Sequence, residues 1–233
     1  MENKDVYKIK PIAYIKTEFR EKFGIPRQSG RIPSAKGKII FENEFNSVDA
    51  VRRIEQFSHL WLIFGFNKNE VSKFSPTVRP PRLGGNEKVG VFASRSPFRP
   101  NGLGLSAVKF DGVEKLDNGK IAINVSGVDL LNDTPIYDIK PYIPSADKID
   151  NAVGGYADKF TEYKLNVVFP PQFLNLIEKE HQQTIIECLE NDPRPAYKNE
   201  SFTYGMTFAN YNIKFKVSDN QLIVEQVENL SNR

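Results

Sequence analysis

The sequence predicts a mainly β protein, with a closed or nearly closed β-barrel followed by a small α+β domain. Short apolar segments with strand character are separated by turn residues, which is typical of barrels. These segments do not alternate regularly with helices, so a doubly wound Rossmann sheet is not expected. With 233 residues, 39% of them hydrophobic, the chain is long enough for one packed core and a small appendage. We place the barrel in residues 1–169 and the C-terminal domain in residues 170–233, with the boundary at Pro170-Pro171.

The first third of the chain contains three expected strands and one expected helix. Residues 6–17 alternate loosely around Pro11 and predict an edge strand, because proline lacks a backbone donor for the ladder. Residues 37–42 predict a short second strand. Ser47 is a typical helix N-cap, and the apolar residues after it repeat at helical spacing: Val48, Val51, Ile54 and Phe57. Residues 60–66 are continuously apolar, which predicts a strand that is buried on both faces.

The remaining elements complete the barrel and form the appendage. Residues 103–113 and 120–128 predict strands joined by Asp117-Asn118-Gly119, because Asn-Gly is a strong hairpin signal. Residues 129–144 predict a tight loop region around a short strand. Residues 172–190 have the apolar stripe of an amphipathic helix. The predicted hairpin of the appendage lies at residues 213–217 and 222–227, around Asp219-Asn220.

The stretch from residue 77 to residue 110 is dense in proline, glycine and arginine around an expected strand at residues 89–93. Proline fixes φ and glycine permits positive φ, so rigid, irregular loops are expected at both ends of this strand. We expect Phe92, Phe98 and Leu103 to anchor these loops in the core. Between residues 79 and 99, the single acid Glu87 accompanies five cations, which are Arg79, Arg82, Lys88, Arg95 and Arg99. Arginine held between prolines is suited to binding phosphate or carboxylate.

Composition excludes several classes of protein. The net charge is only +3, so the clustering of arginine is a better indication of an anionic partner than the overall charge. The single cysteine, Cys188, excludes an internal disulfide framework and fits a cytoplasmic protein, with the thiol expected in the core. No signal peptide is expected and no apolar run approaches membrane-spanning length, so no membrane contact is expected. No metal site is predicted, since His59 and His181 lie far apart, and His59 is expected to be a hydrogen-bonded core residue.

Residues 90–108, GVFASRSPFRPNGLGLSAV, resemble the signature of the TsaA/TrmO-type tRNA methyltransferases. Four further segments resemble the same family and follow its order. They are EKFGIPRQ at 21–28, FSHLW at 57–61, DIKPY at 138–142 and DPRPAY at 192–197. The resemblance therefore runs through nearly the whole chain and implies its fold, cofactor and substrate together.

The resemblance implies that the chain binds S-adenosylmethionine on a β-barrel. The substrate would be N6 of an adenosine that lies next to the tRNA anticodon and already bears a threonylcarbamoyl group. The implied cofactor residues are Arg27, Gln28, Asn67, Lys68, Arg95, Leu105, Asp129, Leu130, Leu131, Asn132, Asp133 and Thr134. The implied tRNA contacts are Arg79, Arg82, Arg99, Arg194 and Tyr197. The family also implies a homodimer, with a site that a second copy could complete.

Two sites depart from the family pattern, and several alternatives stay open. The family commonly has His where Asn67 stands, and Asp-Gly-Thr-Pro where this chain has Asn132-Asp133-Thr134-Pro135. Asp133 lacks the conformational freedom of glycine, although Asp tolerates a left-handed backbone better than most residues. Asp138 and Asp129 are both candidate bases for the proton that leaves the nucleophile, and both are equally suited to structural roles. The alternative functions are a non-catalytic barrel that binds S-adenosylmethionine or RNA, and a methyltransferase that acts on another substrate.

Overall fold

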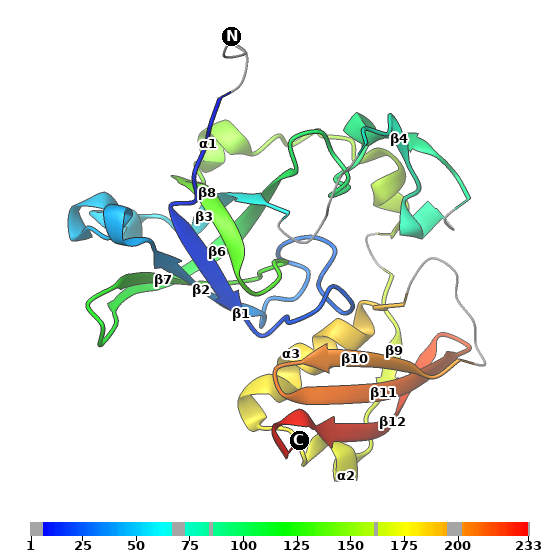
Figure 1. The fold of residues 1–233 in the computed structure, drawn as a ribbon. Helices are drawn as coiled ribbons and strands as arrows, with labels where there is room; N and C mark the ends of the chain where they lie inside the picture. The colour runs from blue at the N-terminus through cyan, green and yellow to red at the C-terminus, as the bar shows by residue number, and fades with distance from the viewer. Residues whose placement is uncertain (1–6, 67–72, 84–85, 161–162, 195–201, 233) are drawn as a thin grey trace.

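Six antiparallel strands close into a barrel in the structure, which is a computed structural model that describes residues 7–66, 73–83, 86–160, 163–194 and 202–232 (Figure 1). The strands are β1 (Ala13–Thr17), β2 (Lys36–Phe41), β3 (His59–Gly65), β6 (Leu103–Lys115), β7 (Ile121–Ser126) and β8 (Thr134–Pro141). Around the barrel they are ordered β1-β2-β7-β6-β3-β8. The expected mainly β, non-Rossmann barrel is therefore confirmed. Within the described residues, no helix combines the length and the apolar character needed to cross a membrane.

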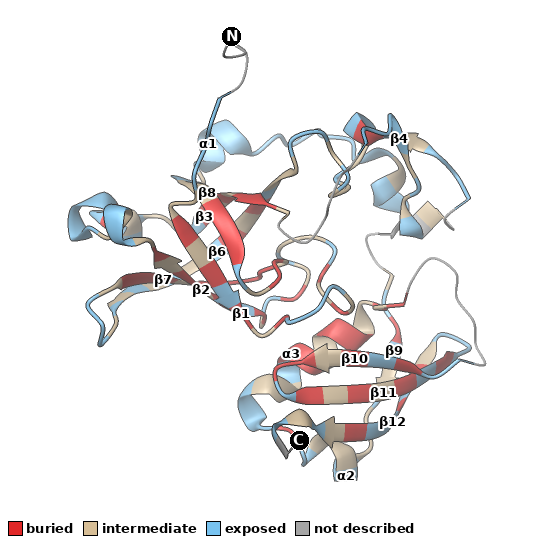
Figure 2. Ribbon diagram, in the orientation of Figure 1, coloured by how far each residue is buried: buried red, intermediate tan, exposed pale blue. Residues whose placement is uncertain are grey.

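Burial alternates along β1, β2 and β3, and the buried side chains of these strands contribute to the barrel core (Figure 2). In β3, Leu60, Leu62 and Phe64 are buried, whereas the residues between them are half-buried. The expectation that this strand is buried on both faces is therefore wrong: its outer face is only partly covered. Gly104 lies opposite Phe64 in the β3–β6 ladder, and a Cβ at Gly104 would lie 2.3 Å from Cζ of the Phe64 ring. Only glycine leaves room for this ring in the core.

The hairpin expected between residues 103 and 128 is confirmed as β6 and β7. Two other strands differ in length from the expectation. The first strand begins at Ala13 instead of residue 6, and the short strand expected within residues 129–144 is the eight-residue β8. The strand β8 is long because it pairs with β1 at its start and with β3 along the rest of its length, which closes the barrel.

The helix expected after Ser47 is replaced by two short 3₁₀ helices, η2 (Val48–Val51) and η3 (Ile54–Gln56), and a third, η1 (Asn43–Phe45), precedes Ser47. Ser47 does cap η2, since its side chain accepts a hydrogen bond from the backbone N–H of Asp49. Continuation as one helix is prevented at Arg53, which has a left-handed backbone with φ of 69°. The apolar repeat at residues 48–57 therefore belongs to separate turns, and of its four apolar members Val51 is buried whereas Val48 is exposed.

The proline-rich stretch has less strand than expected. It contains β4 (Thr77–Val78), η4 (Pro81–Leu83), β5 (Val89–Gly90) and η5 (Val91–Ala93), with β4 and β5 paired. Val91 is buried, but Phe92 and Phe98 are 75% and 53% exposed, so the expectation that these two rings are core anchors is wrong. Beyond the barrel strands, the chain continues through α1 (Pro144–Asp147) and η6 (Gly155–Phe160).

The C-terminal part is a four-stranded sheet with helices on one face. It contains β9 (Asn166–Val168), α2 (Pro171–Leu174), α3 (Lys179–Glu190), β10 (Tyr204–Phe208), β11 (Tyr211–Ser218), β12 (Gln221–Asn229) and η7 (Leu230–Asn232). The expected hairpin is confirmed as β11 and β12, whereas the expected single helix is divided into α2 and α3. Cys188 is buried, as expected, and burial raises the pKa of its thiol.

The strand β9 precedes Pro170-Pro171 but pairs in parallel with β12, so it belongs to the C-terminal sheet. We propose that the C-terminal domain begins before β9 rather than at the two prolines.

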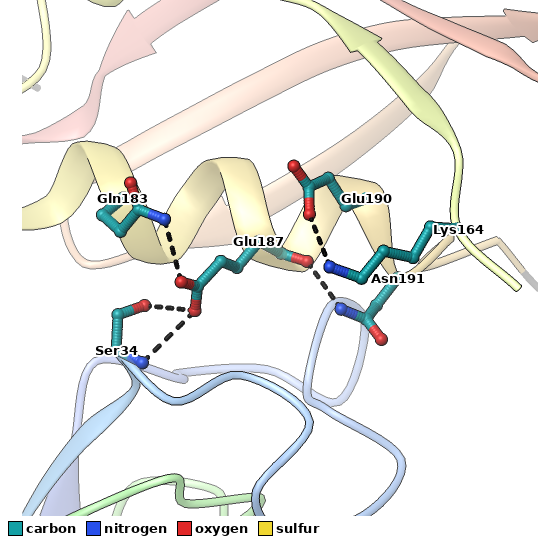
Figure 3. Close-up of polar contacts among 6 residues, drawn as sticks. All are labelled: Ser34, Lys164, Gln183, Glu187, Glu190 and Asn191. Carbon is teal, nitrogen blue, oxygen red and sulfur yellow. Dashed lines mark hydrogen bonds and ion pairs between the residues drawn. The ribbon is translucent and has the colours of Figure 1, made fainter. Parts of the chain in front are cut away.

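The β1–β2 loop, residues 18–35, joins the barrel to the C-terminal sheet. The Phe19 ring packs edge-on against Phe208, with centroids 5.2 Å apart. At the other end of the loop, Ser34 donates from its backbone N–H and its hydroxyl to the Glu187 carboxylate of α3, at 3.2 and 2.6 Å (Figure 3). Thr184 donates in turn to the Ser34 carbonyl. One continuous set of buried side chains therefore connects the two parts.

Candidate functional site

Three residues that were predicted to bind the cofactor gather at the end of the barrel where β1 finishes and β2 begins. Gln28 comes from the β1–β2 loop, Arg95 follows η5, and Asp129 follows β7. Arg95 Nη1 donates to Gln28 Oε1 at 2.6 Å, a bond between residues 67 positions apart in sequence. Burial raises the pKa of the Asp129 carboxyl, and the positive charge of Arg95 lies near enough to oppose part of this rise. The three side chains therefore form one polar cluster.

Asp129 is the most desolvated member of this cluster. Burial raises its pKa, while a hydrogen bond from Ser106, a backbone hydrogen bond from Ser29 and the charge of Arg95 act in the opposite direction. The Ser106 hydroxyl donates to Asp129 Oδ1 at 2.7 Å from inside the barrel, where Ser106 is 2% exposed. A buried carboxylate with three stabilising partners is held in one place and is a stronger base than an exposed one.

The segment that follows Asp129 is shaped by its own side chains. Asn132 Oδ1 accepts from the Thr17 backbone N–H at 3.0 Å, and the Thr134 hydroxyl donates to the Leu131 carbonyl at 2.7 Å. Leu130 and Leu131 are both buried. These predicted cofactor residues therefore hold the loop in shape, and the leucines have little surface left for a ligand.

Asp133 has a left-handed backbone, with φ of 63°. This is the conformation for which the family glycine would be suited, and aspartate adopts it more readily than most residues. The Asp133 carboxylate forms an ion pair with Lys16 of β1. Aspartate is therefore accommodated at this position in the left-handed conformation.

Leu105 and Asp138 lie on the outer face of the barrel, whereas Ser106 points into the barrel. Both are opposite Ile63 in the ladders of β3. Leu105 is 54% exposed. The Asp138 carboxylate accepts from the backbone N–H of Ile139 and pairs with Lys140 at 2.9 Å. The two candidate bases, Asp129 and Asp138, thus lie on different sides of the barrel wall, and only Asp129 belongs to the cluster.

The predicted tRNA arginines have different environments. Arg79 is exposed. Arg99 is half-buried and donates from Nη1 to the Ser94 carbonyl at 2.9 Å, which holds its own loop. Arg194 is only 5% exposed and forms a buried ion pair with Asp192, with Nε to Oδ1 at 2.7 Å. Burial removes Arg194 from the surface at which RNA could be reached. Asn67, Lys68, Tyr197 and the Arg82 side chain lie outside the residues that the structure describes.

Arg27 was expected beside the cofactor, but its described contacts are with the C-terminal domain. Arg27 Nη2 donates to the backbone carbonyl of Arg194 at 2.9 Å and to that of Asp192 at 3.4 Å. His59 also differs from the expectation of a core residue. It is exposed, with its Nδ1 2.9 Å from the Ser58 hydroxyl and its ring edge-on to Tyr142.

A cavity of about 370 Å³ lies elsewhere, at the opposite end of the barrel. Its lining is mostly apolar and includes Ile12, Phe41, Phe45 and Ile123. It contains none of the cluster residues, and its one acid, Glu44, is paired with Lys10. Because a charged cofactor needs several polar partners, the polar cluster is the better candidate site.

Sequence reasoning missed Ser29 and Ser106, the two serines that fix Asp129. Ser106 could have been recognised as a lone polar residue within an apolar strand. The alternation of side chains along that strand directs it inward, where a buried hydroxyl needs a partner. Ser29 offered no such signal, because its contribution is a backbone N–H that only the folded loop brings to Asp129.

Comparisons with known proteins match both parts of the chain. The tRNA-methyltransferase O N-terminal domain model matches residues 14–148, and the TrmO C-terminal domain model matches residues 162–230. The chain is 38% identical to the tRNA (adenine(37)-N6)-methyltransferase of Escherichia coli, over 91% of this chain and 94% of that protein. It is 41% identical to a putative S-adenosylmethionine-dependent methyltransferase of Pseudomonas aeruginosa, over 82% of this chain and 84% of that protein.

The fold agrees with the sequence matches. A crystal structure of TrmO from Pseudomonas aeruginosa superposes with a TM-score of 0.76 at 30% identity, covering 96% of this chain and 99% of that one. The chain therefore belongs to the tRNA-methyltransferase O family.

Proposed function

We propose that this protein is an enzyme that transfers the methyl group of S-adenosylmethionine to N6 of an adenosine at position 37 of tRNA. The observation that carries the proposal is the match to the family across both domains, with relatives whose names state this activity. The polar cluster of Gln28, Arg95 and Asp129 supports it, because it occurs where the family resemblance places the cofactor.

The side chains of the site fit the chemistry of S-adenosylmethionine. The Arg95 guanidinium is exposed and oriented by Gln28, so it is available for the methionyl carboxylate. Asp129 and the backbone around it offer acceptors for amino or hydroxyl groups. Among the leucines expected to flank adenine, Leu105 has exposed surface, whereas Leu130 and Leu131 do not. None of these contacts requires a metal ion.

The reaction requires alignment and the loss of one proton. S-adenosylmethionine supplies an activated methyl group, so the protein chiefly orients the nucleophile toward it. We propose Asp129 as the residue that accepts the proton from N6, because burial raises the pKa of its carboxyl. Ser106 and Ser29 hold this carboxylate, which keeps its acceptor oxygen in a fixed direction.

The substrate we propose is tRNA whose adenosine already bears the threonylcarbamoyl group. That group carries a carboxylate, and the proline-rich stretch carries the excess of arginine that such an anion needs. We further propose that the enzyme is a cytoplasmic homodimer. Phe92, Phe98 and Leu105 are exposed, and a second copy that covered them would remove apolar surface from water.

Nucleoside mass spectrometry of tRNA from cells with and without the gene tests the proposal directly. The methylated nucleoside should disappear when the gene is removed, return fully with the wild-type gene, and return only in part with a variant that lacks Arg95. In vitro, the wild type should methylate modified tRNA and leave an unmodified transcript of the same sequence unchanged. Equal methylation of both RNAs would remove the threonylcarbamoyl requirement, and binding without any methylation would favour a non-catalytic barrel.

A further inference from the structure

The C-terminal domain holds the β1–β2 loop at several points along its length. The backbone N–H of Ala209 donates to the Glu18 carbonyl at 3.0 Å, and that of Thr207 donates to Glu21 Oε1 at 3.0 Å. Further along the loop, Arg27 donates to the backbone carbonyls of residues 192 and 194, and Ser34 donates to the Glu187 carboxylate. The loop that enters the candidate site is therefore positioned from outside the barrel.

Arg27 is the contact that lies next to the site. The three residues after it turn back to the barrel end: Gln28 bonds to Arg95, Ser29 to Asp129, and the Gly30 N–H to the Gly127 carbonyl at 2.8 Å. Arg27 is thus the last residue held by the C-terminal domain before three residues that shape the site. A shift of Arg27 would move the Gln28 side chain and the Ser29 N–H together.

The carbonyls that Arg27 binds are themselves fixed by a buried network. Asp192 pairs with Arg194 through Oδ1 to Nε at 2.7 Å and Oδ2 to Nη2 at 3.1 Å, and Tyr163 donates to Asp192 at 2.9 Å. Asp192 has a left-handed backbone, with φ of 53°. A buried ion pair with complete hydrogen bonding is suited to specifying one conformation of the chain.

We infer that Arg27 is a positioning residue that transmits the shape of the buried Asp192–Arg194 segment to the cofactor loop. The inference deepens the proposed function, since it assigns the C-terminal domain a role in organising the barrel site. Arg27 acts through Gln28 and Ser29 instead of through contact with the cofactor. Asp192, which lies outside the polar cluster, should therefore influence cofactor binding as well.

The test uses the full-length protein with three variants and two controls. Arg27→Ala removes the bonds to both carbonyls, and Arg27→Lys keeps the charge without the planar fork. Asp192→Asn disrupts the buried pair, while asparagine still tolerates the left-handed backbone. Glu187→Gln is the matched control, because it weakens the other clamp between the same loop and the same domain. Arg20→Ala removes an exposed arginine of the same loop.

Two quantities are measured for each protein: hydrogen exchange of peptides that cover residues 24–31, and S-adenosylmethionine affinity by calorimetry. Arg27→Ala and Asp192→Asn should lower the protection of this segment and weaken affinity by roughly tenfold, the effect of losing one hydrogen bond between the displaced loop and the cofactor. Arg27→Lys should recover part of the exchange protection and part of the S-adenosylmethionine affinity. Glu187→Gln should lower the melting temperature without either change, and Arg20→Ala should change nothing.

Different failures are distinguishable. If Arg27→Ala weakens affinity while loop protection and the Asp192→Asn affinity stay native, Arg27 contacts the cofactor directly and the inference is overturned. An equal loss in Glu187→Gln would overturn it too, because any loosening of the domains would then suffice. If the wild type binds no S-adenosylmethionine, the proposed function fails, and exchange of residues 24–31 still decides the role of Arg27. Should Asp192→Asn not fold, Tyr163→Phe removes only one bond to Asp192 and is measured in its place.

Discussion

Replacement of Arg95 by alanine should weaken the binding of S-adenosylmethionine and alter the pH dependence of methylation. A charge-assisted hydrogen bond contributes about 1.5–3 kcal/mol. Arg95 is exposed, so solvent screening places the expected loss near the lower end, at about tenfold in affinity. Calorimetry with Arg95→Ala, and with Arg79→Ala as an exposed control from the same stretch, measures this loss. An unchanged affinity in a natively folded Arg95→Ala protein would refute the assignment.

The second effect follows from the electrostatics of Asp129. The charge of Arg95 favours the ionised form of this carboxyl, so its removal raises the pKa of Asp129 further. If Asp129 accepts the proton, the acid limb of the pH–rate profile must move to higher pH in Arg95→Ala. Arg95→Lys keeps the positive charge but loses the planar guanidinium that Gln28 orients. The affinity for S-adenosylmethionine should therefore fall, while the acid limb of the pH–rate profile stays at the same pH. A lower affinity with an unmoved limb in Arg95→Ala would show that Arg95 acts on the cofactor alone and that Asp129 is not the base.

Three further predictions concern stability and tRNA binding. The folded state raises the pKa of Asp129, so ionisation of this carboxyl opposes folding of the wild type. As the pH rises above 3.8, the ordinary pKa of this side chain, the stability of Asp129→Asn relative to the wild type should therefore increase. A stability difference that does not vary with pH in denaturant titrations would contradict this. Gly104→Ala should cost about 1–3 kcal/mol in the free energy of unfolding, since its Cβ would overlap the Phe64 ring. Gly90→Ala, with open space around its Cβ, is the control and should be near neutral. Arg79→Ala should weaken the binding of modified and unmodified tRNA equally. The slope of log affinity against log salt concentration should fall by about 0.7–0.9, which is the effect of one lost phosphate contact. An effect confined to modified tRNA would instead assign Arg79 to the threonyl carboxylate.

The sequence by itself determined the barrel and its hairpins. Alternation along residues 103–128 and the Asn118-Gly119 turn are local signals, and they specify a hairpin wherever it is placed in the fold. The left-handed backbone of Asp133 is also local, because the residue types that tolerate it are few. Local signals were less reliable at residues 48–57, where an apolar repeat fits one helix or several short turns, and the backbone at Arg53 decided between them.

Only the tertiary structure decided which of the predicted residues lie together. Gln28, Arg95 and Asp129 lie on three loops, and their meeting depends on how the closed barrel places the ends of its strands. The family resemblance carries no information on burial, so it grouped Arg194 with the tRNA contacts, whereas the structure buries Arg194 in an ion pair with Asp192. It grouped Arg27 with the cofactor residues without indicating the bonds of Arg27 to backbone carbonyls of the C-terminal domain. The physical reason is that strand propensity is a property of a short segment. The desolvation and hydrogen bonding of a side chain are set by residues that are distant in sequence and become neighbours only in the folded chain.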